Sequence, residues 1–400
     1  MIDKKCLKDF DIGLLLVAFL LLTFGCLAVY SATYSGYHFL FWRQITWVGL
    51  GILLGIILYL VPYKFWNDFS WLFFLISIGG LVLVLFIGAP IKGVKRWLFG
   101  VQPSEIAKLG TLFLLASFLS NKKFHVRRLR NLVIPLIIVG IPFILVLIEP
   151  DIGTSLVFIF LGFLMLFYKG VGILYLFIII SPIIALLYGA HWLSLTGFLI
   201  TLGFIFYFVR LPLNDFIPAF SVNLLSGLLY PVFWNRLQPY QRMRITGFIS
   251  PSHDPQGIGW QLLQSKIAIG SGGLIGKGIL GGTQKGFAFL PQAHTDFIFA
   301  AIGEEFGFLG CCALLVCFFV LLWKGIVIAK TARSDFAGFL AIGIVGVLGF
   351  HVFINVGMTL GIVPVVGVPL PFIGYGGSSM SVSLVMIGLL LNISKHKYEY

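Results

Sequence analysis

The 400-residue sequence contains few charged residues. Only 10% are Asp, Glu, Lys or Arg, against about a quarter in a typical soluble domain. Hydrophobic residues make up 59%, and the mean hydropathy is +1.05. A core surrounded by water cannot absorb this much apolar surface, whereas a bilayer can. Disorder is excluded as well, because 41 Phe and 9 Trp are the opposite of a disordered composition. The composition predicts an all-α polytopic membrane protein.

Several signatures are also missing. The five cysteines are odd in number and have no spacing typical of a disulfide framework or a zinc site. The net charge is +13, yet there is no basic tail or aromatic–basic stripe, so nucleic acid is not an expected partner. The first apolar run is too long for the core of a cleavable signal peptide. We therefore interpret it as the first membrane span.

Apolar runs of about 17 to 25 residues predict ten transmembrane helices. They lie near 12–32, 42–61, 70–89, 105–120, 131–148, 152–168, 171–190, 297–323, 336–358 and 376–393. The segment 191–235 predicts an extra pair, formed by a strongly apolar run at 192–208 and a weaker one at 216–234. We interpret 1–400 as a single integral-membrane domain.

Basic residues in short loops predict the orientation, because such loops stay in the cytoplasm. The loop 121–131 holds five of them and is the strongest indicator. Both termini are then expected inside, and the long segment 236–295 outside as an extracytoplasmic loop carrying short helices. Seven glycines between 270 and 282 indicate either close backbone approach or flexibility.

Ionisable side chains in membrane spans are costly, so they are candidates for a functional site. Glu105 and Lys108 are three residues apart and share a helix face. They form either a structural ion pair or the lining of a substrate cavity. Glu149 and Asp151 join two spans; Asp151 either caps the next helix or, with Glu149, holds a cation or orients a sugar. Trp97 suits an aromatic membrane anchor as well as a site.

Asp296 is the sharpest candidate. It lies in the sequence His294–Phe297, which ends the outer loop and opens a span. Its carboxylate either satisfies the free amides of a helix N-terminus or faces a cavity as a proton acceptor or cation ligand. Glu304 lies about two turns further on nearly the same face, which favours a site. Prolines and glycines within 355–379 break any helix, so this connection is expected to dip back toward the same site.

These residues resemble the SEDS family (shape, elongation, division, sporulation), which contains RodA, FtsW and SpoVE. The matching stretches run in order along nearly the whole chain: 95–97 (KRW), 102–108 (QPSEIAK), 149–154 (EPDIGT), 254–261 (DPQGIGWQ), 264–273 (QSKIAIGSGG), 289–291 (FLP), 294–297 (HTDF), 303–305 (GEE) and 369–379 (PLPFIGYGGSS). The stretch 264–273, with 276–278 (GKG) and 282–284 (GTQ), is more similar to the RodA branch than to FtsW. Gln292 and Gly374 depart from the residues common in the family, Glu and Ser, and so does the extra pair of spans.

The resemblance implies a peptidoglycan glycosyltransferase that polymerises lipid II at the outer face of the bacterial cytoplasmic membrane during elongation. Expected partners are a class B penicillin-binding protein, other elongation-complex proteins and membrane lipids. The resemblance makes Asp296 the catalytic residue, and Trp97, Glu105 and Lys108 functionally sensitive positions. The full set of expected substrate-binding residues is Trp97, Glu105, Lys108, Glu149, Asp151, Arg242, Arg244, Lys277, Lys285, His294, Ser378 and Ser379.

The expected chemistry is the attack of a sugar 4-hydroxyl on the C1–pyrophosphate bond of a second sugar. A carboxylate takes the hydroxyl proton, and cations stabilise the leaving pyrophosphate. The candidates are Arg242, Arg244, Lys266, Lys277 and Lys285, with a divalent cation, magnesium or manganese, for which Asp296 is a candidate ligand. The alternatives are a flippase or transporter of lipid-linked sugars, a division-type FtsW-like polymerase, and a non-catalytic scaffold.

Overall fold

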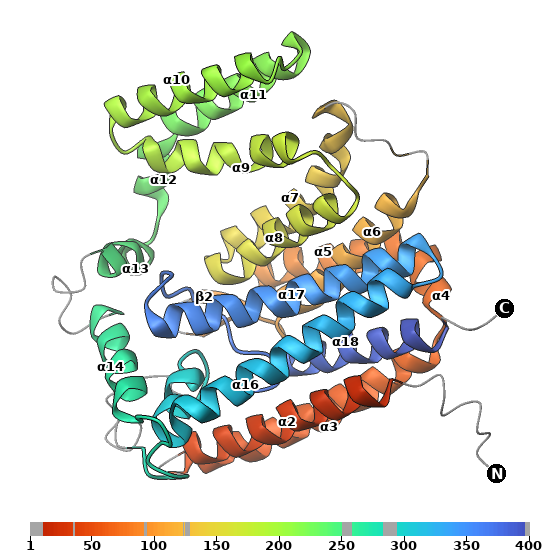
Figure 1. Ribbon diagram of the computed structural model, residues 1–400, viewed down its shortest axis with the longest axis vertical. Coiled ribbons are helices and arrows are strands. Elements are labelled where there is room, and N and C mark those ends of the chain that lie inside the picture. Colours follow the sequence, from red (N-terminus) through yellow and green to blue (C-terminus); the bar gives the residue numbers. More distant parts are fainter. Residues whose placement is uncertain are drawn as a thin grey trace.

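The computed structural model describes residues 11–34, 37–91, 94–122, 124, 129–249, 258–282 and 294–396 (Figure 1). A helix lies at each of the ten expected spans and at the expected extra pair. The helices are α2 (Ile12–Thr33), α3 (His38–Leu60), α4 (Tyr63–Asp68), α5 (Ser70–Ile87), α6 (Pro103–Ser120), η1 (Leu129–Leu132), α7 (Val133–Ile148), α8 (Ile152–Tyr168), α9 (Ile173–Tyr188), α10 (Trp192–Phe208), α11 (Leu213–Leu228), α12 (Tyr230–Arg236), α13 (Pro239–Ile249), α14 (Ile258–Ser271), α16 (Ile298–Thr331), α17 (Asp335–Leu360) and α18 (Gly377–Lys395). Strands β1 (Ala89–Ile91) and β2 (Val94–Trp97) form an antiparallel hairpin.

Within the described residues, seven helices are long and apolar enough to cross a membrane, and eight if the bent pair α11–α12 counts as one span. Helices α8, α9 and α10 are equally apolar in character but have only 16 or 17 residues. The prediction of an all-α polytopic membrane protein is confirmed. The short helices α13 and α14 occupy the segment that was expected to carry such elements.

The bundle has two distinct ends. Figure 1 shows that α2 begins and α18 ends at one of them, which we call the terminal end. The opposite end, the hairpin end, holds β1–β2, α13, α14 and the connection between α17 and α18. This arrangement matters for function because the polar sequence motifs gather at the hairpin end.

The centre of the bundle is formed by α17 and α18. The best apolar windows of these helices are 72% and 94% buried, against 22–33% for the other long spans. Small residues permit the close packing: a Cβ on Gly388 of α18 would stand 2.3 Å from the carbonyl oxygen of Gly55 on α3. Without a hydrophobic driving force between helices in lipid, such close van der Waals contact is what holds spans together.

Helices α9, α10 and α11 form a separate layer beyond α7 and α8 (Figure 1). They have a small core of their own, with Ile178, Leu202, Phe206 and Ala219. Buried Asp215 of α11 links this layer to the bundle, because it accepts a hydrogen bond from the backbone N–H of Leu129 at 3.3 Å. The extra pair therefore packs mainly on α9 and leaves the hairpin end open.

The glycine-rich run packs against a break in α16. Gly307 has φ 64° and ψ −164°, a conformation that is essentially restricted to glycine. The break frees backbone groups, and the run supplies partners for them: Phe308 N–H donates to Gly273 O at 2.9 Å, and Gly278 N–H donates to Glu305 O at 3.0 Å. A Cβ on Gly276 would stand 2.1 Å from Glu305 O. Of the two sequence interpretations, close backbone approach is the one the structure bears out.

Candidate functional site

A polar cavity of about 560 Å³ opens at the hairpin end. Segments far apart in the sequence converge on it, including β2, α6, α8, α13, the start of α16 and the loop 361–376. Eight of the residues expected at the site lie in its wall: Trp97, Glu105, Asp151, Arg244, His294, Asp296, Ser378 and Ser379. The expected return of the loop between α17 and α18 to this site is confirmed, because Val366, Gly367 and Pro369 also line the cavity.

Asp296 lies beside a cation in this cavity. Both side chains approach Gly367, which has φ +74°: a Cβ placed there would stand 3.3 Å from Asp296 Oδ2 and 3.7 Å from Arg244 Nη1. The side chain of Asn355 on α17 donates a hydrogen bond to the backbone carbonyl of Asp296 at 2.9 Å. Asp296 is therefore held in the cavity wall, and the positive charge of Arg244 approaches the same glycine.

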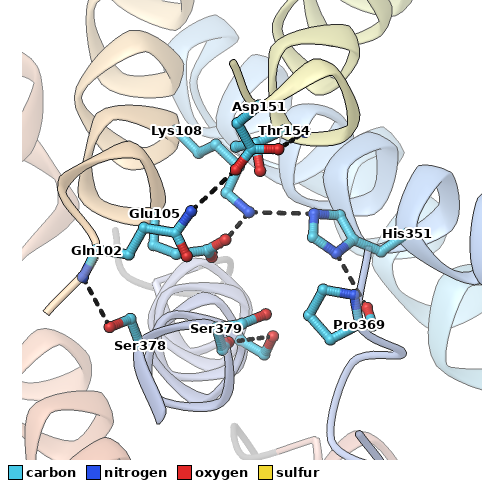
Figure 2. A network of polar contacts seen from close by, with 10 residues as sticks. Gln102, Glu105, Lys108, Asp151, Thr154, His351, Pro369, Ser378 and Ser379 are labelled. Atoms are coloured by element: carbon cyan, nitrogen blue, oxygen red, sulfur yellow. Dashed lines mark hydrogen bonds and ion pairs between the residues drawn. The ribbon is translucent and has the colours of Figure 1, made fainter. Parts of the chain in front are cut away.

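Glu105 and Lys108 form the structural ion pair that was one of their two sequence interpretations. Lys108 Nζ lies 2.8 Å from Glu105 Oε2, with the two side chains 1% and 4% exposed, so they form a buried ion pair. Glu105 also lines the cavity, whereas Lys108 points behind it. Lys108 Nζ continues to His351 Nε2 at 3.1 Å, as Figure 2 shows. The pair thus connects the cavity wall to α17.

Asp151 both caps a helix and lines the cavity. Its Oδ1 accepts a hydrogen bond from Thr154 N–H at 3.2 Å, and its Oδ2 accepts one from Gln102 Nε2 at 3.1 Å (Figure 2). Arg96 Nη1 lies 3.7 Å from the same Oδ2. Arg96 also donates to the backbone carbonyls of Glu149 and Pro150. A cation is thereby fixed beside the acid in the cavity wall.

The Glu149 side chain lies outside the cavity lining. It is 1% exposed, in the connection that follows α7. Burial first, and then the Asp151 charge, raise the pKa of its carboxyl to about 8, against an opposing effect of Arg96. Glu149 is therefore protonated at neutral pH. One sequence interpretation was that Glu149 helps to bind a cation. That role requires the ionised carboxylate, which burial disfavours.

Of the basic residues expected to meet pyrophosphate, Arg244 is the one that lines the cavity within the described part of the chain. Arg242, two residues earlier on α13, lies 5.8 Å from the Trp234 ring and donates to Asn235 O. Lys277 binds Glu304 Oε1 at 2.7 Å. Lys285 falls outside the described residues.

The expected role of Glu304 below Asp296 also needs correction. The glycine-rich run crosses the break in α16 and brings Lys277 directly onto Glu304, which is 1% exposed. Lys266 instead packs against Gly361, whose added Cβ would stand 2.5 Å from its Cε. These contacts give Lys277 and Glu304 a structural role beside the helix break.

The sequence analysis missed four polar residues of the site. Arg96 and Gln102 were noticed only as parts of motifs, although both line the cavity. His351 and Asn355 lie behind the cavity wall on α17, 4% and 0% exposed. Their spacing of four residues within an apolar span was an available signal, because it places two polar side chains on one helix face.

The donor groups of the site do not form a metal cage. Among the residues that the structure describes, no three His, Cys, Asp or Glu side chains come together as ligands. Magnesium usually keeps several waters and takes one or two carboxylates from the protein. Asp296 fits such a minor ligand role, but the protein groups alone do not specify a metal.

Comparisons with known proteins cover nearly the whole chain. The cell cycle protein family FTSW_RODA_SPOVE matches residues 12–198 and 194–399. Stage V sporulation protein E of Bacillus subtilis (strain 168) is 34% identical over 96% of this chain and 97% of its own length. The peptidoglycan glycosyltransferase MrdB of Escherichia coli (strain K12) is 35% identical over 99% and 97%.

Solved structures show the same fold. A chain of "Structural coordination of polymerization and crosslinking by a peptidoglycan synthase complex" has a TM-score of 0.73 and 27% identity, covering 98% of this chain and 99% of that one. The Thermus thermophilus rod shape determining protein RodA has a TM-score of 0.64 at 24% identity, over 98% of both chains, and supports the fold alone.

Proposed function

The chain belongs to the cell cycle protein family FTSW_RODA_SPOVE, and we propose that it is a peptidoglycan glycosyltransferase that polymerises lipid II. The observation that carries the proposal is the presence of Asp296 and Arg244 in one cavity, both close to Gly367. A proton acceptor beside a fixed cation is what glycosyl transfer from a pyrophosphate requires. Relatives named as peptidoglycan glycosyltransferases give the substrate class.

Asp296 is the general base in this proposal. The acceptor sugar's 4-hydroxyl oxygen attacks C1 of the donor sugar, and the hydroxyl proton passes to the Asp296 carboxylate. Such proton transfer contributes about 10²–10⁴-fold to a rate when the base lies within hydrogen-bond reach. The bond between C1 and the pyrophosphate oxygen breaks as the new glycosidic bond forms, so the donor's electron pair leaves with the pyrophosphate.

Arg244 and Arg96 stabilise the departing pyrophosphate. Both line the cavity, and Arg96 is anchored by backbone carbonyls at Glu149 and Pro150. A guanidinium held in a fixed orientation suits phosphate oxygens, because it presents several donors in one plane. Preorganised charge of this kind stabilises the transition state without a reorganisation cost. If a magnesium or manganese ion takes part, Asp296 would be a ligand, and the ion would supply further positive charge for the leaving pyrophosphate.

The hairpin end faces the outside of the bacterial cytoplasmic membrane in this proposal, and both termini lie inside. Helix α6 ends and α7 begins at the terminal end (Figure 1). The sequence between them has five basic residues between 121 and 131, and such loops stay cytoplasmic. The elongation role follows the RodA-type stretches 264–273 and 276–278. The proposed partner is a class B penicillin-binding protein that supplies crosslinking, in line with the synthase complex that shares this fold.

The test is polymerisation of lipid II by the purified protein, with and without a class B penicillin-binding protein, with product length resolved on a gel. The wild type should form a ladder of glycans, and Asp296→Ala should leave lipid II unextended while remaining folded. Asp335→Ala is the matched control, because Asp335 is an exposed acid in the first turn of α17 at the terminal end. Labelled lipid II that crosses proteoliposomes without being lengthened would identify a flippase instead.

A further inference from the structure

Helix α17 presents two buried polar side chains to the hairpin end. His351 and Asn355 are four residues apart and therefore lie one above the other on the same face. They are 4% and 0% exposed in a helix that is otherwise almost entirely apolar. Polar groups at such depth are costly unless they make hydrogen bonds. Their partners therefore indicate why the sequence has them.

Asn355 ties two segments together. Its single side-chain amide group donates one hydrogen bond to Val368 O at 2.8 Å and another to Asp296 O at 2.9 Å. The two acceptors belong to the loop 361–376 and to the turn that precedes α16. One buried side chain thus fixes the residue proposed as the base against the loop 361–376, which also lines the cavity.

His351 makes the corresponding connection to the ion pair. Its Nε2 lies 3.1 Å from Lys108 Nζ, and its Nδ1 lies 3.3 Å from Pro369 O. An ammonium group has only donors, so Nε2 must accept, and Nδ1 carries the proton that is donated to the carbonyl. Figure 2 shows the imidazole between the lysine and the proline. The second bond reaches the residue directly after Val368.

The loop 361–376 depends on side-chain hydrogen bonds to its backbone. Residues 364–370 form neither helix nor strand, so neighbouring secondary structure does not take up their carbonyls by default. Irregular backbone at membrane depth is tolerated only where it is buried in protein or lines a cavity. The consecutive carbonyls of Val368 and Pro369 receive side-chain hydrogen bonds from one helix face.

We propose that His351 and Asn355 are positioning residues, which use the carbonyls of Val368 and Pro369 to hold Asp296 in register with the Glu105–Lys108 pair. We call this arrangement the α17 clamp. It rests on the proposed function, because register between these groups matters only for a reaction in the cavity. A displacement of about 1 Å between reacting groups can lower a rate about 10²-fold. Loss of the clamp should therefore reduce kcat far more than it changes the KM for lipid II.

The decisive comparison is between two buried asparagines. Asn392 is also 0% exposed and donates to backbone carbonyls, those of Leu58, Tyr59 and Val61, but at the terminal end of the bundle. Asn355→Ala and Asn392→Ala should lower Tm by comparable amounts. Asn355→Ala should lower kcat about 100-fold per folded protein with KM within about threefold, whereas Asn392→Ala should leave kcat within about threefold of wild type.

A second pair of variants tests the histidine. Gln can accept from Lys108 and donate to Pro369 O, so His351→Gln should retain at least a tenth of the wild-type kcat, while His351→Leu should lose more than 30-fold. Equal kcat for Asn355→Ala and Asn392→Ala, with wild type active and Asp296→Ala inactive, overturns the clamp and leaves the proposed function standing. A folded wild type that cannot lengthen lipid II overturns the proposed function and the clamp with it.

Discussion

Breaking the Glu105–Lys108 pair from one side should destabilise the protein strongly. Lys108→Met keeps the length and apolar bulk of the side chain but removes the ammonium. The Glu105 carboxylate, 4% exposed and 2.8 Å from Lys108 Nζ, then loses its cation. Removal of one partner of a buried pair costs about 3–5 kcal/mol, because an uncompensated charge remains in a medium of low dielectric. A large fall in Tm is the expected result.

The double variant Glu105→Gln/Lys108→Met isolates this cause. It removes both charges, so its free energy of unfolding should return to within about 1–2 kcal/mol of wild type, since apolar or neutral replacements of buried pairs are often close to neutral. Thermal unfolding of the three proteins in the same detergent measures the difference. If the double variant is as unstable as Lys108→Met, the loss comes from packing rather than from the stranded charge, and the argument fails.

The remaining predictions concern three other positions. Arg244→Ala should lower the rate of lipid II polymerisation about 10²–10³-fold, while Arg242→Ala, which loses only its contacts with Trp234 and Asn235, should stay within a few-fold of wild type in the same assay. The folded-state pKa of Glu149, about 8, lies above its ordinary value. Between about pH 4.5 and 8 the folded state therefore holds a proton that the unfolded state loses. The free energy of unfolding should fall as pH rises through this range, by at most about 1.4 kcal/mol per pH unit. Tm measured from pH 5 to 9 should show this slope in wild type and a weaker one in Glu149→Gln, and identical slopes would contradict the assignment. Gly307→Ala places a side chain on a backbone conformation essentially restricted to glycine, with its Cβ 2.4 Å from Gly276 N. The variant should destabilise the folded protein by about 1–3 kcal/mol or more. An unchanged Tm would argue against the break in α16.

The sequence predicted the helices well because the signal for a span is strong. A run of apolar residues long enough to cross a bilayer depends on composition, which needs no knowledge of neighbours. Most of the expected ranges therefore coincide with the observed helices within a few residues. The exceptions are α16, which continues to Thr331 beyond the expected 323, and the range 216–234, which the structure divides between α11 and α12. The Pro- and Gly-rich connection was also placed correctly at the site, because it could not continue a helix.

The site was harder to predict because it depends on which segments meet. Lys277 and Arg244 are both basic residues of the same long outer segment, and sequence alone gave them the same role. The structure separates them, since the break at Gly307 brings the glycine-rich run, and Lys277 with it, onto Glu304, while α13 carries Arg244 to the cavity. The roles of His351 and Asn355 were harder to predict than their shared helix face, because three of their four hydrogen-bond partners are backbone carbonyls of distant segments, which the sequence does not identify.

The most direct test of the account is the initial rate of glycan synthesis by Asp296→Asn. The amide has nearly the same shape as the carboxylate, so it should preserve the fold and the backbone hydrogen bond from Asn355, but it cannot accept the proton of the attacking hydroxyl. With equal amounts of folded protein and saturating lipid II, the account predicts a rate at least about 10²-fold below wild type. A rate for Asp296→Asn within a few-fold of wild type would contradict it.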